Sequence, residues 1–254
     1  MGGAMLAGWL ARGLAPKKVV VIEPHPSDEI RALLTKGIRL NPTAKDIGAA
    51  ATLVVALKPQ SFREAGPQIK PFAGPATLVV SIMAGTTIAS IEAICGGSVV
   101  RAMPNTPAAI GRGITVAVAA NNVSADQRAV ADALLRATGS VEWVDDESLM
   151  DAVTAVSGSG PAYVFLLAEE LARAGVEAGL PPDLATKLAR ETVAGSGELL
   201  HRSELASATL RQNVTSPGGT TAAALEVLMA KDGMQPLLTR AVAAATRRSK
   251  ELAK

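Results

Sequence analysis

The chain has 254 residues, long enough to bury a large core and to form two domains. Its 25 Lys and Arg nearly balance its 23 Asp and Glu, and 2% of its residues are aromatic, so neither a basic surface nor a base-stacking platform indicates a nucleic-acid partner. Although 48% of the residues are hydrophobic, no apolar run reaches the ~18 positions of a membrane span, and no signal-peptide pattern opens the chain.

The first half of the chain alternates helical stretches with short β-branched runs. A helical stretch that ends at Gly13 comes first. Apolar residues then occupy successive positions in each run, which is typical of strands buried on both faces of a parallel sheet. We therefore predict a Rossmann-like, doubly wound α/β domain over residues 1–146. The expected strands are Lys18–Ile22, Thr52–Leu57, Thr77–Ile82, Ser98–Met103, Thr115–Ala120 and a weaker one near Val141–Val144.

From Glu147 onward the strand pattern stops. Segments rich in Ala, Leu and Glu follow, with turn or helix-end signals at Gly179–Pro182, Ser216–Gly219 and Asp232–Gly233. The last segment places apolar and small residues from Leu238 to Leu252 on one helical stripe. This half predicts an all-α domain over residues 147–254.

The segment Ala162–Leu171 is apolar nearly all round until its two glutamates. A helix of this kind has to be buried, and in a small domain a second subunit is the best cover. We therefore expect a homodimer that associates through the segment beginning at Pro161, with the active site near the subunit boundary. A higher assembly, such as a ring of dimers, stays open.

The start of the chain contains a fragment of a dinucleotide-binding pattern. Such a fold begins with a strand and a glycine-rich turn before its first helix. Gly2 matches the last glycine of that turn, and Glu23 follows 21 positions later, near the ~20 residues at which an acidic side chain meets the ribose hydroxyls. We expect that the first strand and first glycines are missing, through a start codon assigned too far downstream or a trimmed chain. The neighbouring strands would then lack a hydrogen-bonding partner. The alternative is that Gly2 and Gly3 are accidental and Glu23 is a solvated strand end.

Four ordered blocks make the pattern more specific. They are Val55–Pro59, Ser81–Gly85, Arg101–Ala108, and the pair Ser157–Tyr163 and Val214–Thr221. Each block taken alone could be an ordinary strand-to-helix turn or a close helix contact. Taken together they resemble the pyrroline-5-carboxylate reductase family over the whole chain except the expected first strand.

The resemblance implies NAD(P)H-dependent reduction of 1-pyrroline-5-carboxylate to L-proline, the last step of proline biosynthesis. It implies that Thr221 holds the ring nitrogen, that Gly218, Gly219 and Thr220 bind the carboxylate, that Glu147 contacts the substrate, and that Glu204 joins a catalytic proton network. The turn before residue 220 also has the composition of an anion-binding concavity, with a helix amino terminus behind it. Glu147 could instead be an acidic residue in a helix's first turn, and Glu204 a solvated helix charge.

The resemblance also assigns cofactor contacts, and NADP or NAD is the implied cofactor. Many family members carry Ser, Asn or Arg near the end of the second strand and use NADPH. Glu23 would repel a 2′-phosphate, so this chain favours NADH. Thr43 stands where family members often have Asn. The implied cofactor residues are Gly2, Gly3, Glu23, Thr43, Ala56, Leu57, Lys58, Pro59, Ile82, Met83, Ala84 and Asn213.

Two other readings stay open. A β-hydroxyacid dehydrogenase of the same build would carry a lysine about four residues after the glycine cluster of the second domain, where this chain has Val164. A non-catalytic protein that binds a nicotinamide or an amino acid is the other alternative. The single Cys95 cannot form an intramolecular disulfide, which favours the cytoplasm. Cys95, His25 and His201 have no zinc-ligand spacing, so we expect no metal site.

Overall fold

The computed structural model describes residues 1–252. Its contacts divide the chain into two compact units, one formed by Met1–Gly158 with the residues from Ala245 onward and the other by Ser159–Ala244. The division by contacts thus falls after Gly158, whereas the composition changes near Glu147. The domain boundary between residues 146 and 147 stays a prediction.

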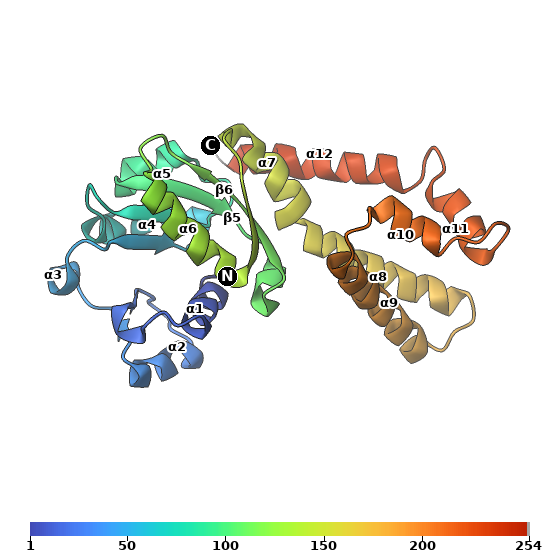
Figure 1. The fold of residues 1–254 in the computed structure, drawn as a ribbon, viewed down its shortest axis with the longest axis horizontal. Coiled ribbons are helices and arrows are strands. Elements are labelled where there is room, and N and C mark those ends of the chain that lie inside the picture. Colours follow the sequence, from blue (N-terminus) through green and yellow to red (C-terminus); the bar gives the residue numbers. More distant parts are fainter. Residues whose placement is uncertain (253–254) are drawn as a thin grey trace. The chain divides into compact units, whose positions relative to one another are not determined.

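A five-stranded sheet forms the centre of the first unit (Figure 1). Its order is β3 (Thr52–Val55), β4 (Leu78–Ser81), β5 (Ser98–Met103), β6 (Gly113–Ala119) and β7 (Gly139–Trp143). All neighbours are parallel except β5 and β6, which are antiparallel. The prediction of a purely parallel sheet was therefore wrong at this pair. Residues 104–112 hold only a short 3₁₀ turn, and a parallel crossover needs a longer connection.

Two further strands form a separate parallel pair, β1 (Val20–Val21) with β2 (Arg39–Leu40). The run Lys18–Ile22 thus gives a strand of only two residues, and β2 was not predicted. Among the described residues β1 has one hydrogen-bonded neighbour, β2, and β3 is an edge strand of the five-stranded sheet, with β4 as its neighbour. The expectation that strands at this place lack a partner because a first strand is missing stays a prediction.

Helices cover both faces of the five-stranded sheet (Figure 1). On one face Met5 of α1 and Leu135 of α6 pack with Leu78 and Val80. On the other, Phe62 of α4 and Ile91 of α5 pack with Val55 and Val79. Neighbouring residues of β4 therefore point to opposite faces of the sheet and are buried on each, which confirms the prediction of strands buried on both faces. The helices of this unit are α1 (Gly2–Ala11), α2 (Asp28–Ala32), α3 (Ala44–Ile47), α4 (Pro59–Ile69), α5 (Ile88–Cys95), α6 (Ala125–Leu135) and α7 (Met150–Val153).

Helix α1 is fixed to its neighbours by close contacts along its length. The indole Nε1 of Trp9 donates to the carbonyl of Leu134 at 2.8 Å. Gly8 faces Ala137 so closely that a Cβ at Gly8 would lie 2.7 Å from the Ala137 carbonyl oxygen. Because Met5 is fully buried as well, α1 packs closely against its neighbours in the first unit.

The second unit is helical, as predicted. It contains α8 (Gly160–Glu177), α9 (Pro182–Arg202), α10 (Ser207–Asn213), α11 (Thr220–Leu228) and the first part of α12 (Met234–Leu252). A π-helical turn, Thr154–Gly158, precedes α8. Helices α8 and α9 form a hairpin, in which Ala185 and Ala189 are buried and a Cβ at Gly175 would lie 3.2 Å from the Ala185 Cβ. Small residues thus allow the two helices to pack closely.

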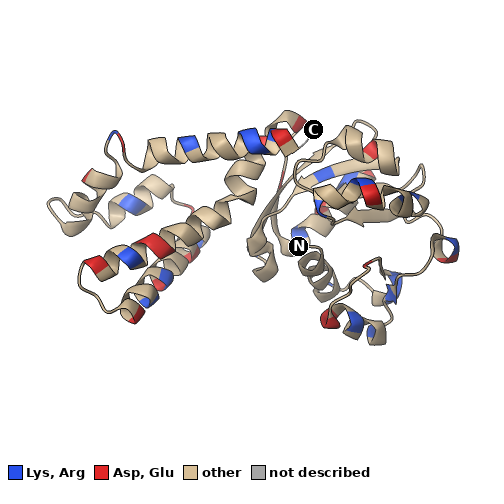
Figure 2. Ribbon diagram, turned by 180° about the vertical axis from the view of Figure 1, so that it is seen from behind, with Lys and Arg blue, Asp and Glu red and all other residues tan. Residues whose placement is uncertain are grey.

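Charged residues of both signs are interspersed along α8 and α9 (Figure 2), with Arg173 paired to Glu169 and Glu170. Large apolar side chains are exposed between them, and no residue of α8 is buried. Phe165 is 68% exposed and Leu166 53%. The chain by itself therefore leaves uncovered the helix that the sequence requires to be buried. Within residues 1–252, no helix combines the length and the apolar character that crossing a membrane would need.

Candidate functional site

Three loops meet at one edge of the five-stranded sheet. Strands β3, β4 and β5 are parallel neighbours, so the segments that follow them leave the sheet from the same edge. Open α/β sheets bind ligands beyond the carboxyl ends of their strands. After β3 come Ala56 and Leu57, and then Lys58 and Pro59 begin α4. The structure thus brings the blocks predicted from the sequence to a common edge.

The amino terminus of α1 lies at this edge too. A Cβ at Gly2 would lie 3.0 Å from the Ala56 Cβ, and a Cβ at Gly3 would meet nothing within 4 Å. No side chain caps the helix. The first N–H groups of a helix have no intrahelical partner, and together with the helix dipole they attract anions. The place fits the pyrophosphate of a dinucleotide, because its amides are open and glycine allows close approach.

The loop after β4 carries Ile82, Met83 and Ala84. The side chain of Met83 is 1% exposed and packs in the core with Val55 and Phe62. Its N–H donates to the Ser81 hydroxyl at 3.3 Å. Any contact between Met83 and a cofactor therefore involves the main chain, whereas Ile82 and Ala84 are half-buried and can present side chains.

Glu23 follows β1, as predicted, and both its side chain and its backbone form hydrogen bonds. Its Oε1 accepts the N–H of His25 at 2.9 Å. Its own N–H donates to Asn41 Oδ1 at 2.8 Å, and Asn41 Nδ2 donates back to the Glu23 carbonyl at 2.9 Å. Asn41 has φ 51°, a left-handed conformation that Asn tolerates better than most residues. The sequence reasoning missed Asn41, and an Asn directly after a short strand was the available signal.

Thr43 has a structural role in the fold. It is the N-cap of α3, where its hydroxyl donates to Asp46 Oδ2 at 2.6 Å. This hydrogen bond lowers the pKa of the exposed Asp46 carboxyl. The predicted contact of Thr43 with a cofactor stays a prediction.

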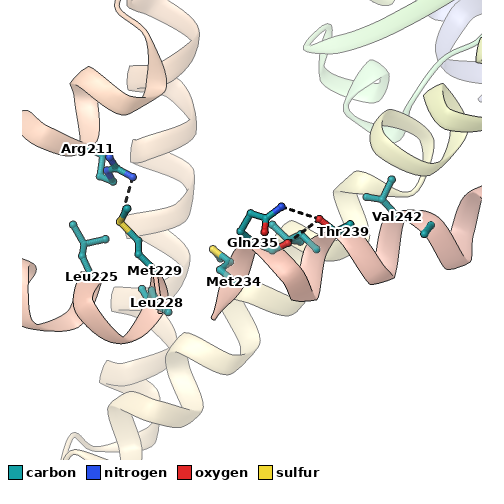
Figure 3. Close-up of a pocket in the computed structure, with 10 residues that line it drawn as sticks. Arg211, Leu225, Leu228, Met229, Met234, Gln235, Thr239 and Val242 are labelled. Carbon is teal, nitrogen blue, oxygen red and sulfur yellow. Dashed lines mark hydrogen bonds between the residues drawn. The ribbon is translucent and has the colours of Figure 1, made fainter. Parts of the chain in front are cut away.

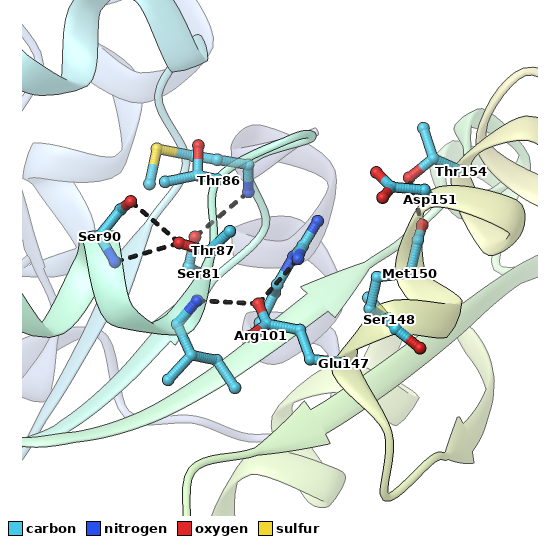
Figure 4. Close-up of polar contacts among 12 residues, drawn as sticks. Ser81, Thr86, Thr87, Ser90, Arg101, Glu147, Ser148, Met150, Asp151 and Thr154 are labelled. Atoms are coloured by element: carbon cyan, nitrogen blue, oxygen red, sulfur yellow. Dashed lines mark hydrogen bonds and ion pairs between the residues drawn. The ribbon is translucent and has the colours of Figure 1, made fainter. Parts of the chain in front are cut away.

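Glu147 is engaged with protein groups (Figure 4). Its Oε1 accepts from Arg101 Nη1 at 2.7 Å and from the backbone N–H of Ile88 at 2.8 Å. It begins a 3₁₀ turn, Glu147–Leu149, as the alternative reading of an acid in a helix's first turn anticipated. The predicted contact with substrate stays a prediction. Sequence reasoning placed Arg101 in a block but gave it no role, although a charge in an apolar strand requires a partner.

Apart from Glu147, which lies in the first unit, the predicted substrate residues form a turn and a helix start in the second unit. Gly218 has φ 69°, and the N–H of Gly219 donates to the Ser216 carbonyl at 3.0 Å. Gly219 is then the N-cap of α11, with Thr220 and Thr221 as the first helical residues and no side chain capping the helix. Thr221 is half-buried. The open N–H groups of this helix start suit a carboxylate.

The two remaining predicted residues lie in the same unit. Asn213 is the last residue of α10 and is exposed. Glu204 is exposed in the loop between α9 and α10, so the alternative reading of Glu204 as a helix charge was wrong about its location. The segment Ser203–Ala206 separates α9 from α10. A catalytic role of Glu204 stays a prediction.

An apolar groove runs along α11 and α12 (Figure 3). Arg211 reaches into it from α10, and its Nη1 lies 3.3 Å from the sulfur of Met229. Met229, which lines the groove, is 59% exposed. Like α8, this groove is an apolar surface that a single chain leaves open. Its other lining residues are Leu225, Leu228, Met234, Gln235, Leu238, Thr239, Val242 and Ala243.

Fold and site together define a dinucleotide-binding α/β protein with a helical second unit. Residues 147–252 match the family described as "Pyrroline-5-carboxylate reductase dimerisation". The chain is 43% identical to a pyrroline-5-carboxylate reductase of Synechocystis, over 100% of this chain and 96% of that protein. It is 39% identical to the Pseudomonas aeruginosa enzyme, over 100% and 93%. The chain belongs to the pyrroline-5-carboxylate reductase family.

Solved structures agree. The chain is similar to a pyrroline-5-carboxylate reductase of Coxiella burnetii, with a TM-score of 0.88 and 33% identity over 100% of this chain and 95% of that one. It is also similar to the Plasmodium falciparum pyrroline carboxylate reductase with NADP bound, with a TM-score of 0.82 and 29% identity over the same shares. These similarities confirm the predicted Rossmann-like fold followed by a helical domain.

Proposed function

We propose that this chain reduces 1-pyrroline-5-carboxylate to L-proline with a hydride from NADH or NADPH. The observation that carries the proposal is the 43% identity to a pyrroline-5-carboxylate reductase along the whole chain. The alternative of a β-hydroxyacid dehydrogenase gains no support, because Val164 of α8 provides no general base for alcohol oxidation. The family and the strand-edge loops likewise favour an enzyme over a non-catalytic binding protein.

The cofactor residues belong to the first unit, apart from Asn213. Gly2 and Gly3 would hold the pyrophosphate on the open amides of α1. Ala56, Leu57, Lys58 and Pro59 would contact the dinucleotide along the end of β3, and Ile82, Met83 and Ala84 would do so after β4. Thr43 would contact the adenosine side as a hydrogen-bond acceptor while its hydroxyl donates to Asp46. When bound, the cofactor supplies the hydride.

The proposed substrate residues belong to the second unit, apart from Glu147, whose predicted contact with substrate would come from the first unit. The N–H groups at Gly218, Gly219 and Thr220 would bind the carboxylate at the start of α11, where the helix dipole favours a negative charge. The Thr221 hydroxyl would hold the ring nitrogen and so fix which face of the imine carbon is presented to the hydride. A protonated imine is already electrophilic, so this chain needs to supply orientation more than a strong acid. Glu204 would help to deliver or hold the proton at the nitrogen.

Cofactor choice follows from Glu23. A carboxylate at the end of β1 can accept hydrogen bonds from both ribose hydroxyls of NADH but faces a 2′-phosphate with like charge. We therefore expect NADH to be used at least as well as NADPH. The test compares kcat/KM for NADH and NADPH at pH 8. A tenfold or greater preference for NADPH at that pH would refute the assignment, and Glu23→Ser is expected to improve the use of NADPH.

Self-association is the second part of the proposal. The uncovered apolar side chains of α8 and the groove along α11 and α12 both lie in the region that matches a dimerisation family. A second copy of the chain is the partner that this family implies, and we propose a homodimer that includes α8. A ring of dimers is a further possibility of the same kind. A cytoplasmic location stays a prediction, supported by one buried free thiol, Cys95.

The experiment follows the absorbance of the reduced nicotinamide while purified chain acts on 1-pyrroline-5-carboxylate with NADH or NADPH. The expected result is oxidation of the cofactor that depends on the imine, with L-proline as the product. Thioproline with oxidised cofactor provides the reverse assay. A chain that binds NADH or NADPH but converts neither substrate would refute the proposed reaction.

A further inference from the structure

Arg101 is the only charged side chain among residues 1–252 that is buried in the structure, with 4% exposure. It lies in β5, opposite Ser81 of β4 and Val118 of β6. An isolated guanidinium in such a place would be strongly unfavourable, so its partner has to be fixed as well. The sequence position that supplies this partner is Glu147, far along the chain from β5.

Glu147 connects Arg101 to a third segment. One carboxylate oxygen accepts both Arg101 Nη1 at 2.7 Å and the N–H of Ile88 at 2.8 Å (Figure 4). Ile88 is the first residue of α5, and the N-cap Thr87 accepts the N–H of Ser90 with its own side chain. The Glu147 side chain thus accepts a hydrogen bond from a helix N–H that the cap leaves without a partner. Its negative charge also interacts favourably with the positive end of the helix dipole.

The loop between β4 and α5 is held at both ends by this arrangement. At its start, Ser81 is paired in the ladder with Arg101 and accepts the N–H of Met83. At its end, Ile88 is held by Glu147. Between these two points lie Ile82, Met83 and Ala84, with the buried Thr86 hydroxyl near the Ala84 carbonyl at 3.5 Å. The residues at the two ends of the loop are therefore in contact with Arg101 or Glu147, which themselves lie outside the loop.

We propose that Arg101 and Glu147 are a positioning pair for the cofactor loop, and that Glu147 acts through Ile88 and Arg101 instead of touching the imine. The inference rests on the proposed function, since it takes Ile82–Ala84 as part of the nicotinamide cofactor site. Loss of the Glu147 carboxylate leaves a buried charge without its partner and releases the start of α5. The affinity for the cofactor then falls, while the substrate site in α11 keeps its own residues.

The experiment measures NADH and NADPH binding by fluorescence in the absence of imine, and then the KM values for cofactor and imine together with kcat. Glu147→Ala should weaken cofactor binding about tenfold and raise the cofactor KM by a similar factor, with the imine KM and kcat within about threefold of the parent. Glu147→Gln keeps an oxygen that can accept from Ile88, and it should recover most of the affinity. Arg101→Met removes the other member of the pair, and it should likewise weaken cofactor binding and raise the cofactor KM.

Asp146→Ala is the matched control. Asp146 is the neighbouring acid, and its carboxylate accepts the N–H and hydroxyl of Ser148 within the same turn. Its loss should lower the melting temperature slightly without changing cofactor affinity. A raised imine KM with unchanged cofactor binding in Glu147→Ala would overturn the inference in favour of direct substrate contact. A lower melting temperature with unchanged cofactor binding in all three variants would leave the pair only a structural role and would overturn it too.

These results are distinct from failure of the proposed function. If the parent chain binds neither NADH nor NADPH, the proposed reaction fails. If the parent binds a cofactor and Glu147→Ala and Glu147→Gln bind it equally well, only the positioning inference fails. Should Glu147→Ala not fold, Arg101→Met and Arg101→Lys decide the question, because a merely structural pair would show no selective change in the cofactor KM.

Discussion

Gly8 sets how closely α1 approaches the rest of the first unit. A Cβ at this position would lie 2.7 Å from the carbonyl oxygen of Ala137 and 3.3 Å from its Cβ. Ala137 belongs to a 3₁₀ turn, Arg136–Thr138, so the neighbour is backbone and cannot rotate away. Gly8→Ala therefore has to displace α1, whose amino terminus lies beside Ala56.

The magnitude follows from two opposing contributions. Replacing Gly by Ala inside a helix stabilises by about 0.5–1 kcal/mol, whereas overpacking a tight contact costs about 1–3 kcal/mol. The contact is short enough that we expect a net loss of about 1–2 kcal/mol, or ~3–6 °C in melting temperature for a domain of this size. Because α1 moves, NADH binding should weaken too.

The assay compares Gly8→Ala with Gly3→Ala by thermal unfolding. Gly3 is in the same helix, and a Cβ there would meet nothing within 4 Å. Gly3→Ala should therefore unfold at the same temperature as the parent or slightly above it. A Gly8→Ala chain that is as stable as Gly3→Ala would refute the argument that this contact fixes α1.

Three other substitutions test the remaining features. Thr221→Ala should lower kcat far more than it weakens cofactor binding, whereas Thr221→Ser should keep activity; equal activity of Thr221→Ala and parent would remove the hydroxyl from the mechanism. Phe165→Glu, at a side chain that is 68% exposed on α8, should shift a dimer towards monomer in sedimentation; a parent that is monomeric at micromolar concentration would contradict the dimer. Asp132→Asn should lower the melting temperature at pH 7 by ~2–4 °C at most, as expected for an ion pair near the surface. The Arg136 hydrogen bond lowers the pKa of Asp132 in the folded state, so its stabilisation is present above the unfolded pKa and is lost as pH falls through the folded value. A difference between Asp132→Asn and parent that persists unchanged at pH 2–3 would contradict that explanation.

Local patterns were enough to predict most strands and the change to helices. Ser98–Met103 was predicted with the bounds that it has, because it is a short, β-branched and mostly apolar segment next to Gly96 and Gly97. Lys18–Ile22 looked similar but became a two-residue strand, since strand length depends on the neighbours that are present to pair with it. The antiparallel direction of β6 depended on the short connection after β5, which composition alone does not express.

The candidate site divides in the same way. Strand-end blocks such as Val55–Pro59 and the turn before Thr221 could be identified from the sequence, because small residues and turn residues have local signatures. The engagement of Glu147 could not be predicted, since its partners Arg101 and Ile88 come from elements that are distant in sequence. The same holds for Asn41, whose side chain bonds to Glu23 across two strands.

The sequence by itself determined the family, the order of an α/β half before a helical half, and the segments from which a site is built. These depend on apolar periodicity and on short motifs, which are properties of neighbouring residues. Only the tertiary structure decided that Met83 turns its side chain into the core, that there is no room for a Cβ at Gly8, and that a buried Arg101 forms an ion pair with Glu147. Each of these is a contact between residues far apart in the chain, and close packing and charge burial act on distance in space.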